Sequence, residues 1–387
     1  MDPPEDEDFR REFRAWLERT APRRGGPGDF SQRPIDPSLP PDRQQELEAA
    51  HARRCLDWQR TLYDAGFACV AWPVEYGGRG GTPAQARIAA TEQAAYGVSS
   101  AALSVGLGMV GPTLLAHGTP EQKARHLPPL ARGEALWCQL FSEPGAGSDL
   151  AGLSTRAEPA GTGWRVTGQK VWSSGAAHAD FGVLLARTDP GRPRHGGISY
   201  FVVDMSAPGV EARPIRQITG AAHFCEVFLT DVALPADALV GALNDGWRVA
   251  NTMLSSERAL IGGRSPDGGA ALWSIAVERG LTGDPAVREL IGRVHAAERV
   301  LALLNAGAHP PSVSKLLVAD HRRRLAEAAL RLSGWAGLLD GPDAPAGGHW
   351  QRELLNAPQY RIAGGTDQIQ RNIIGERVLG LPREPRP

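Results

Sequence analysis

The hydrophobic periodicity of the chain changes twice, and this limits the folds that the chain can adopt. Residues 6–135 have mainly helical spacing, interrupted by joints rich in proline and glycine. From about 136 to 240 the pattern becomes short apolar or alternating runs separated by turns, which is typical of a compact β unit. Helical spacing returns after Gly241 and lasts to the end, where Gly380 and Pro382 close the last helix. We predict a mostly helical α+β protein with domains at 1–135, 136–240 and 241–387.

Composition excludes several classes of protein. The chain has 387 residues, 42% of them hydrophobic and 22% charged, which is ordinary for a globular protein of more than one core. A formal net charge of -1 gives no strong attraction to nucleic acid or anionic membranes. No apolar run of about 18 residues predicts a membrane span, and the acidic start predicts a cytoplasmic protein. The four cysteines lack C-x-x-C spacing and a histidine cluster, so we predict no metal site and no disulfide framework.

The first candidate for a ligand-binding segment is the loop 143–149, with the sequence EPGAGSD, which follows a strand-like run. Its two glycines and their small neighbours let a ligand approach the backbone, and free N–H groups there can bind phosphate oxygens. The hydroxyls of Ser142 and Ser148 can add hydrogen bonds. A tight structural turn explains the same pattern, because glycine-rich loops are common.

A second segment, 169–175 with the sequence QKVWSSG, places an aromatic residue and two hydroxyls at the end of a predicted strand. Trp172 can stack on a planar ring while Ser174 binds the polar edge of that ring. Alternatively, Trp172 is a half-buried residue of the sheet, which is the ordinary environment of such a side chain.

A third segment begins at 363 with the sequence AGGTDQIQRNII. Thr366 is a plausible N-cap of the helix that follows, and the N-terminus of this helix can receive a pyrophosphate or a polarised carbonyl. An ordinary capped helix that turns Ile369 and Ile373 toward the core accounts equally well for the pattern.

In their order and spacing these segments resemble the acyl-CoA dehydrogenase family. The resemblance covers nearly the whole chain, through 71–78 (AWPVEYGG), 143–149, 170–175 (KVWSSG), 228–235 (FLTDVALP), 364–369 (GGTDQI) and 377–382 (RVLGLP). It implies an N-terminal helical domain, a middle β-barrel and a C-terminal four-helix bundle, with FAD between them. It also implies an acyl-CoA substrate, an electron-transferring flavoprotein as oxidant, and usually a homotetramer.

The resemblance also implies which residues bind the cofactor and the substrate. Carried over position by position, the residues implied to contact FAD are Gln139, Phe141, Ser142, Ser148, Trp172, Ser174, Thr366 and Gln368. For the substrate, the family pattern implies that Ser148 lies near the pantetheine arm. It also implies that the backbone N–H of Gly364, or of a neighbour, binds the thioester carbonyl as an oxyanion hole does.

The chemistry requires a carboxylate that takes the α proton while a hydride leaves the β carbon. In many relatives this base occupies the position of Gly364, and in others it occupies the position of Glu257. A helical wheel over 244–261 independently places Glu257 in the middle of an apolar stripe, where desolvation makes a carboxylate a better proton acceptor. We therefore predict Glu257 as the catalytic base, with Arg258 and Gly364 as substrate-binding neighbours. The alternative is a buried ion pair of Glu257 with an arginine that only anchors the helices.

One feature of the family is missing from the sequence. Many relatives have an Arg-x-x-Phe-Gly segment whose arginine reaches the FAD of a neighbouring subunit, and no such segment occurs between residues 264 and 293. Similar replacements occur in relatives that pair with a different subunit or act on bulky acyl groups such as steroid side chains. We therefore expect either a homo-oligomer or a hetero-oligomer with a paralogous subunit.

Together these patterns predict an FAD-dependent dehydrogenase. It would convert an acyl-CoA, or a related acyl thioester, to the trans-2-enoyl thioester and pass the electrons to an electron-transferring flavoprotein. Two alternatives stay open. A flavin oxidase or monooxygenase would use the same fold and let oxygen reach the reduced ring, and a non-catalytic subunit of a heteromeric acyl-CoA dehydrogenase would leave the reaction to its partner.

Overall fold

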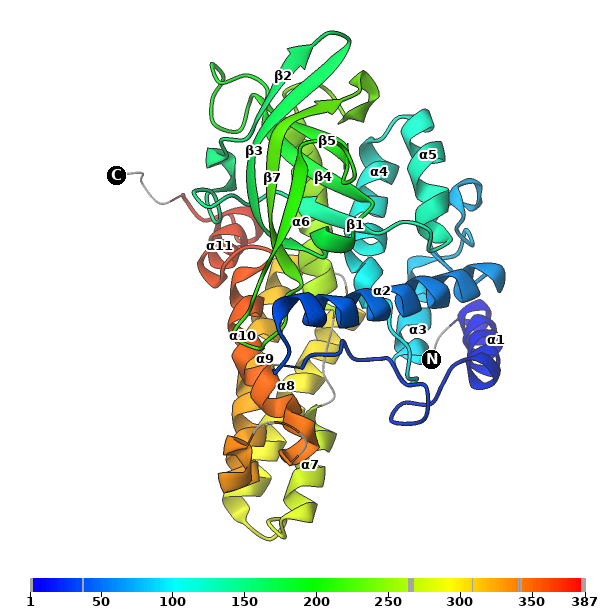
Figure 1. Ribbon diagram of the computed structural model, residues 1–387. Helices are drawn as coiled ribbons and strands as arrows, with labels where there is room; N and C mark the ends of the chain where they lie inside the picture. Colours follow the sequence, from blue (N-terminus) through cyan, green and yellow to red (C-terminus); the bar gives the residue numbers. More distant parts are fainter. Residues whose placement is uncertain are drawn as a thin grey trace. The chain divides into compact units, whose positions relative to one another are not determined.

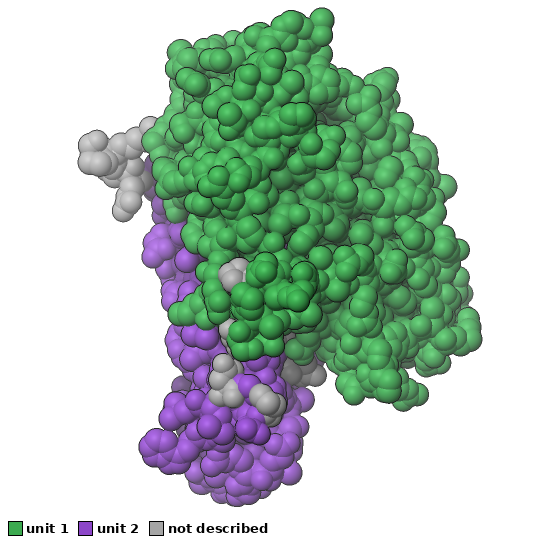
Figure 2. All heavy atoms as spheres, viewed as in Figure 1, with its two compact units in different colours: residues 1–253 green, residues 254–387 purple. Residues whose placement is uncertain are grey.

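The computed structural model describes residues 3–36, 38–263, 268–307, 309–339, 341 and 343–383. The chain forms two compact units, 1–253 and 254–387, which are coloured separately in Figure 2. The boundary between them falls inside helix α6, Gly246–Gly262. The beginning of the stretch that lacks the family arginine segment, 264–267, lies outside the described residues.

In the described part of the first unit, α-helices packed around an aromatic core precede the sheet. These helices are α1 (Pro4–Thr20), α2 (Pro41–Asp64), α3 (Pro83–Gln93), α4 (Gly111–His117) and α5 (Pro120–Ala131). Phe9, Phe13 and Leu17 recur every four residues on α1, so they share one face of the helix and are buried. They pack in one apolar cluster with Trp58 of α2 and with Phe67.

The described strands form one eight-stranded sheet in the order β6-β7-β3-β2-β4-β5-β8, with β1 paired to β4. The strands are β1 (Trp137–Leu140), β2 (Arg156–Ala160), β3 (Gly163–Ser174), β4 (Phe181–Arg187), β5 (Ile198–Asp204), β6 (Val210–Ile215), β7 (Phe224–Leu234) and β8 (Leu239–Val240). Strands β3 and β7 run antiparallel side by side (Figure 1), and their register shifts between Lys170 and Ser173. Leu184, Phe201 and Val227, from three strands, belong to one buried apolar core.

The second unit is helical in its described part. After the end of α6 it contains α7 (Gly268–Glu278), α8 (Pro285–Ala306), α9 (Pro311–Ser333), α10 (His349–Ile362) and α11 (Asp367–Ile373). Helices α7 to α10 share an apolar core to which each contributes, through Leu272, Ile291, Leu325 and Trp350 respectively. None of the helices in the described ranges is both long and apolar enough to span a membrane.

The predicted fold class is confirmed, because helical, β and helical segments follow one another along the chain. The division into three domains at residues 135 and 240 stays a prediction.

Candidate functional site

The residues predicted from the sequence to form the site fall into two groups, one in each compact unit. The first unit contains Gln139, Phe141, Ser142, Ser148, Trp172 and Ser174. The second unit contains Glu257, Arg258, Gly364, Thr366 and Gln368.

A buried ion pair anchors the loop with the sequence EPGAGSD in the first unit. Lys170 on β3 and Glu143 at the start of the loop are both buried, and Lys170 Nζ lies 2.8 Å from Glu143 Oε1. The same ammonium donates a hydrogen bond of 3.0 Å to the carbonyl of Phe141. Glu143 also accepts hydrogen bonds from the backbone N–H groups of Ser154 at 2.7 Å and Thr155 at 2.9 Å. These contacts tie the base of the loop to β3 and to the segment that leads into β2.

Both members of this pair are charged at neutral pH. Burial alone would raise the pKa of Glu143, but the charge of Lys170 and hydrogen bonds from Lys170, Thr155 and Ser154 outweigh burial and lower this pKa to about 2. Burial lowers the pKa of Lys170 to about 8, and the negative charge of Glu143 opposes a further fall. The pair is therefore a compensated buried charge that fixes the loop.

Trp172 occupies a strained position on a bulge of β3. Its backbone φ is +62°, in the left-handed region that residues other than glycine rarely adopt. The register of β3 against β7 shifts between Lys170 and Ser173, and the N–H of Val171 donates to the carbonyl of Ser142 at 2.9 Å. At this bulge 59% of Trp172 is exposed, so it is not the half-buried sheet residue of the alternative interpretation. An exposed aromatic ring held in a strained backbone suits the stacking of a planar ligand.

The other predicted residues of the first unit differ in exposure. Those with side chains open to a ligand are the half-buried Gln139, Ser142 and Ser174 and the exposed Ser148. Phe141 is only 3% exposed, and its ring packs edge-on against Tyr200 with the ring centroids 5.9 Å apart. We therefore expect Phe141 to reach a ligand through its backbone rather than its ring.

The EPGAGSD loop is a tight turn with an open outer face. Glu143 and Ala146 exchange two backbone hydrogen bonds of 3.0 Å, which close the turn. The N–H groups of Gly145, Gly147 and Ser148 donate to no residue within the described ranges. A Cβ on either glycine would have no atom within 4 Å. The loop thus combines the structural turn with backbone donors that can meet an anion.

In the second unit, the carboxyl of Glu257 lies close to Gly364. Glu257 is half-buried on α6. A Cβ placed on Gly364 would lie 3.8 Å from Glu257 Cδ, 3.7 Å from Arg258 Cγ and 3.1 Å from Ile261 Cδ1. The structure thus brings Glu257, Arg258 and Gly364 together. The missing side chain at Gly364 leaves a space that the Glu257 carboxyl borders.

The loop 364–366 joins α10 to α11 and presents backbone donors. Gly364 and Gly365 have φ values of +67° and +96°, which glycine adopts without steric cost. Thr366 caps α11, because its side chain accepts a hydrogen bond of 3.3 Å from the N–H of Ile369. The N–H groups of Gly364, Gly365 and Thr366 donate to no residue in the described part of the chain. Gln368, in the first turn of α11, is exposed.

Two cations compensate the charge of Glu257. Burial lowers the pKa of Arg258, and the charge of Glu257 opposes this shift. Burial also lowers the pKa of Lys315 on α9, and the charges of Asp367 and Glu257 oppose it. Arg258 and Lys315 thus both lie close enough to interact electrostatically with the Glu257 carboxyl.

Several buried polar residues behind these segments have roles that the motifs did not predict. These are Glu143, Lys170, Lys315 and Gln370. One feature of the sequence singles out Lys170 and Lys315: only three of the 42 lysine and arginine residues are lysines. Lys170 lies two positions before Trp172, but Lys315 is far in sequence from the loop it contacts, so spacing alone does not reveal it.

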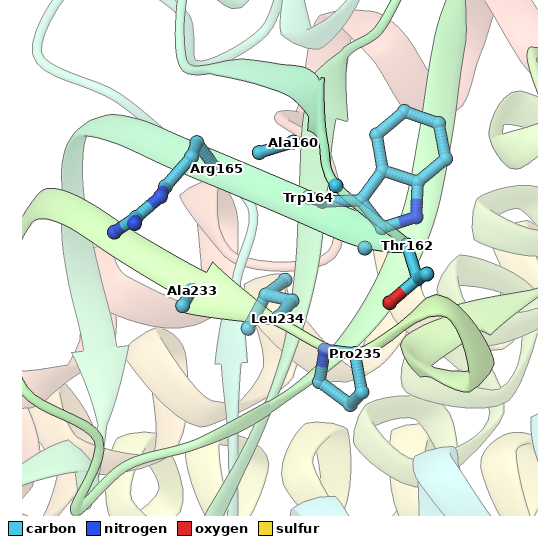
Figure 3. A pocket seen from close by; sticks show the side chains of 9 residues that line it. Ala160, Thr162, Trp164, Arg165, Ala233, Leu234 and Pro235 are labelled. Carbon is cyan, nitrogen blue, oxygen red and sulfur yellow. The ribbon is translucent and has the colours of Figure 1, made fainter.

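A separate pocket lies at the end of the sheet and contains none of the predicted residues (Figure 3). It is lined by Ala160, Gly161, Thr162, Gly163, Trp164, Arg165, Ala233, Leu234 and Pro235. None of these lining residues is a buried charged group.

Family models match three successive parts of the chain. The model described as the acyl-CoA dehydrogenase N-terminal domain matches residues 30–134, the middle-domain model matches 138–232, and the C-terminal-domain model matches 244–379. The chain belongs to the acyl-CoA dehydrogenase family. Members of this family are oxidoreductases and flavoproteins of lipid metabolism, and the family is generally FAD-dependent.

Individual relatives agree with this assignment. Acyl-CoA dehydrogenase IpdE1 of Mycobacterium tuberculosis is 40% identical over 405 residues, which are 98% of this chain and 98% of the relative. Acyl-CoA dehydrogenase FadE34 of the same organism is 44% identical over 336 residues, 84% of this chain, but the chain spans only 46% of the length of FadE34.

Solved structures of the family also match over the whole chain. The ChsE4-ChsE5 complex from Mycobacterium tuberculosis is 29% identical with a TM-score of 0.80, covering 99% of both chains. The Tcur3481-Tcur3483 steroid ACAD is 27% identical with a TM-score of 0.81, again covering 99% of both chains. This acyl-CoA dehydrogenase therefore shares its fold with enzymes of known structure.

Proposed function

We propose that this acyl-CoA dehydrogenase uses FAD to convert an acyl-CoA to the trans-2-enoyl-CoA and passes the electrons to an electron-transferring flavoprotein. The observation that best supports the proposal is the position of Glu257, whose Cδ would lie 3.8 Å from a Cβ on Gly364. In many relatives the base is the residue at the position of Gly364. A side chain attached at this position would begin next to the Glu257 carboxyl. The chain would keep the base and change only the element that carries it.

In this mechanism Glu257 removes the α proton of the acyl group. Negative charge then develops on the thioester oxygen, and hydrogen-bond donors aimed at that oxygen lower the barrier. The N–H groups of the loop 364–366, which donate to no described residue, are suited to this role. Arg258, whose Cγ also lies close to the position of Gly364, would bind the substrate beside the base.

Within each unit, the predicted residues have side chains or backbone groups suited to FAD, which when bound would accept the hydride that leaves the β carbon. In the first unit, Trp172 has 59% of its surface free to stack on a ring system. The groups proposed to bind the polar edge of the flavin are Gln139, the backbone of Phe141, Ser142 and Ser174. Ser148 and its loop would bind phosphate groups or the pantetheine arm, and Thr366 and Gln368 would contact the cofactor from the second unit.

The names of two solved relatives support a choice of substrate and assembly to test first. One solved relative is titled a steroid ACAD, and another is a complex of two named chains, ChsE4 and ChsE5. This chain also lacks the Arg-x-x-Phe-Gly segment of many homo-oligomeric relatives. We therefore propose a bulky, ring-bearing acyl-CoA as substrate and an oligomer that includes a paralogous subunit.

An anaerobic titration of the purified flavoprotein with acyl-CoA esters tests the proposed function. Linear, branched and steroid-side-chain esters are expected to bleach the oxidised flavin to different extents, with the largest effect for a ring-bearing ester. Addition of an electron-transferring flavoprotein should restore the colour faster than oxygen does. Peroxide formed in proportion to substrate would instead identify an oxidase, and the absence of bleaching with every ester, alone and with a paralogous subunit, would reject the proposal.

Replacing Trp172 with glycine is expected to weaken flavin binding without destabilising the apoprotein. A residue other than glycine at φ +62° is strained by about 1–2 kcal/mol, so glycine relieves strain while the exposed indole loses little packing. We expect an apoprotein melting temperature equal to or above that of the wild type and a flavin Kd raised about 5- to 150-fold, since aromatic stacking contributes about 1–3 kcal/mol. Trp335, which is 87% exposed, provides a matched control as Trp335→Gly. Unchanged flavin affinity in Trp172→Gly would contradict the stacking role.

A further inference from the structure

The loop 364–366 is held from behind by a fully buried lysine. The side chain of Lys315 on α9 has no exposed surface, and its Nζ donates a hydrogen bond of 2.7 Å to the carbonyl of Gly365. Oδ1 of Asp367 is 3.9 Å from the same Nζ. The ammonium therefore lies closer to a backbone carbonyl of the loop than to the carboxylate of Asp367.

A second buried side chain holds the same loop. Gln370 on α11 is fully buried, and its Nε2 donates to the carbonyl of Gly364 at 2.8 Å and to that of Gly365 at 3.2 Å. A Cβ on Gly365 would come within 2.5 Å of this Nε2. Glycine at 365 is thus needed for the Gln370 amide to approach the loop this closely.

These anchors determine where the donors of the loop point. In a trans peptide the C=O of one residue and the N–H of the next point in opposite directions. Fixing the carbonyls of Gly364 and Gly365 on Gln370 and Lys315 therefore turns the N–H groups of Gly365 and Thr366 away from these anchors. The N–H of Gly364 belongs to the preceding peptide and also donates to no described residue.

We propose that Lys315 is a positioning residue that holds the loop 364–366 in the conformation in which its N–H groups meet the thioester oxygen. This inference rests on the proposed function, because it assigns the loop the role of stabilising that oxygen. Lys315 does not touch the substrate in this arrangement. It acts through the carbonyl of Gly365, and its positive charge also interacts electrostatically with Glu257.

The chemistry of the site explains why a lysine is kept here in a chain whose basic residues are otherwise almost all arginine. An ammonium is compact and can donate to a single carbonyl. A guanidinium is planar and carries five N–H donors, so burying it calls for several acceptors. Asp367 does not depend on Lys315 for its partner, since Arg361 Nε donates to Asp367 Oδ2 at 2.7 Å. Removing the ammonium would therefore free the loop while Asp367 stays paired with Arg361.

The variant Lys315→Met, measured on the flavin-loaded full chain, tests the inference. We expect kcat to fall about tenfold or more while KM changes less than about threefold, because the donors act mainly in the transition state. Hydrogen–deuterium exchange should quicken at the backbone amides of 363–370 and not across the rest of the second unit. Lys123→Met, which removes the one lysine outside the two buried positions, should match the wild type in both measurements.

Two results would overturn the inference: an unchanged kcat in Lys315→Met, or exchange at 363–370 that matches the wild type. Faster exchange spread over the whole second unit would also overturn it, since that is the behaviour of a general core residue. If Lys315→Met does not fold, Lys315→Met/Asp367→Asn replaces it, with Asp367→Asn as its reference. Failure of the proposed function would look different. In that case none of the acyl-CoA esters would bleach the flavin of the wild type, while hydrogen–deuterium exchange would still report on the conformation of the loop.

Discussion

Glu257→Gln is expected to lower kcat by about 10²–10⁴-fold, the usual contribution of a general base. Glutamine keeps the size of the side chain and its place on α6, but its amide cannot accept the α proton. Glu257 is not among the residues proposed to bind FAD, so the variant should keep its flavin. Single-turnover bleaching of the flavin by an acyl-CoA measures the affected step directly, without interference from reoxidation.

A matched control separates the loss of a base from the loss of a negative charge. Glu289 on α8 is exposed and pairs with Arg293 on the same helix at 2.6 Å, so Glu289→Gln should leave turnover unchanged. Near-normal turnover in Glu257→Gln would reject the assignment of the base. Loss of flavin from this variant would instead support the alternative in which Glu257 only anchors the helices.

The position of Gly364 allows a stronger version of this test. In Glu257→Gly/Gly364→Glu the carboxylate is moved to the position that carries the base in many relatives, which lies beside the original carboxyl. We expect turnover at least about tenfold above that of Glu257→Gly, but below that of the wild type. The rescue should be partial for two reasons. A glutamate at φ +67° is strained by about 1–2 kcal/mol, and the side chain of Ile261 must move to make room for the new Cβ.

Features with a local cause could be predicted from the sequence. The helical wheel placed Glu257 among apolar neighbours of α6, and in the structure Val249, Ala250 and Met253 on this helix are buried while Glu257 is half-buried. The predicted cap at Thr366 is present, with the hydrogen bond from Ile369. Both depend only on residues within a few turns of one helix, which is the range that periodicity and capping rules cover.

Features that depend on strand register or on distant partners could not be predicted in this way. The exposure of Trp172 follows from a bulge, and the bulge exists because β3 slips against β7, which starts about fifty residues later in the chain. Lys315 contacts Gly365 at a separation of 50 residues, and Lys170 contacts Glu143 at a separation of 27. In each case the motif marks a surface that we propose to meet a ligand, while the side chain that fixes the motif comes from another element.

The second large effect is expected for Lys170→Met. This change leaves the buried carboxylate of Glu143 without its ammonium and the carbonyl of Phe141 without its donor. Breaking one side of a buried ion pair costs about 3–5 kcal/mol, so the unfolding transition of the first unit should move to a lower denaturant concentration. The loop and the Trp172 bulge would loosen with it, so flavin affinity should fall in parallel. Lys123→Met, at a half-buried lysine outside the site, is the matched control.

Two further comparisons decide whether loss of the Lys170–Glu143 ion pair causes the loss of stability in Lys170→Met. In Lys170→Met/Glu143→Gln no uncompensated charge is buried, so the double variant should be more stable than Lys170→Met alone.

The pH dependence of stability provides the second comparison. Because the pKa of Glu143 is lowered to about 2 in the folded chain, its stabilising contribution is complete above its ordinary pKa of 4.5 and is lost as the pH falls toward 2. Glu143→Gln should therefore lose less stability than the wild type over this acid range, and an equal loss would show that the pair does not act as a charged unit.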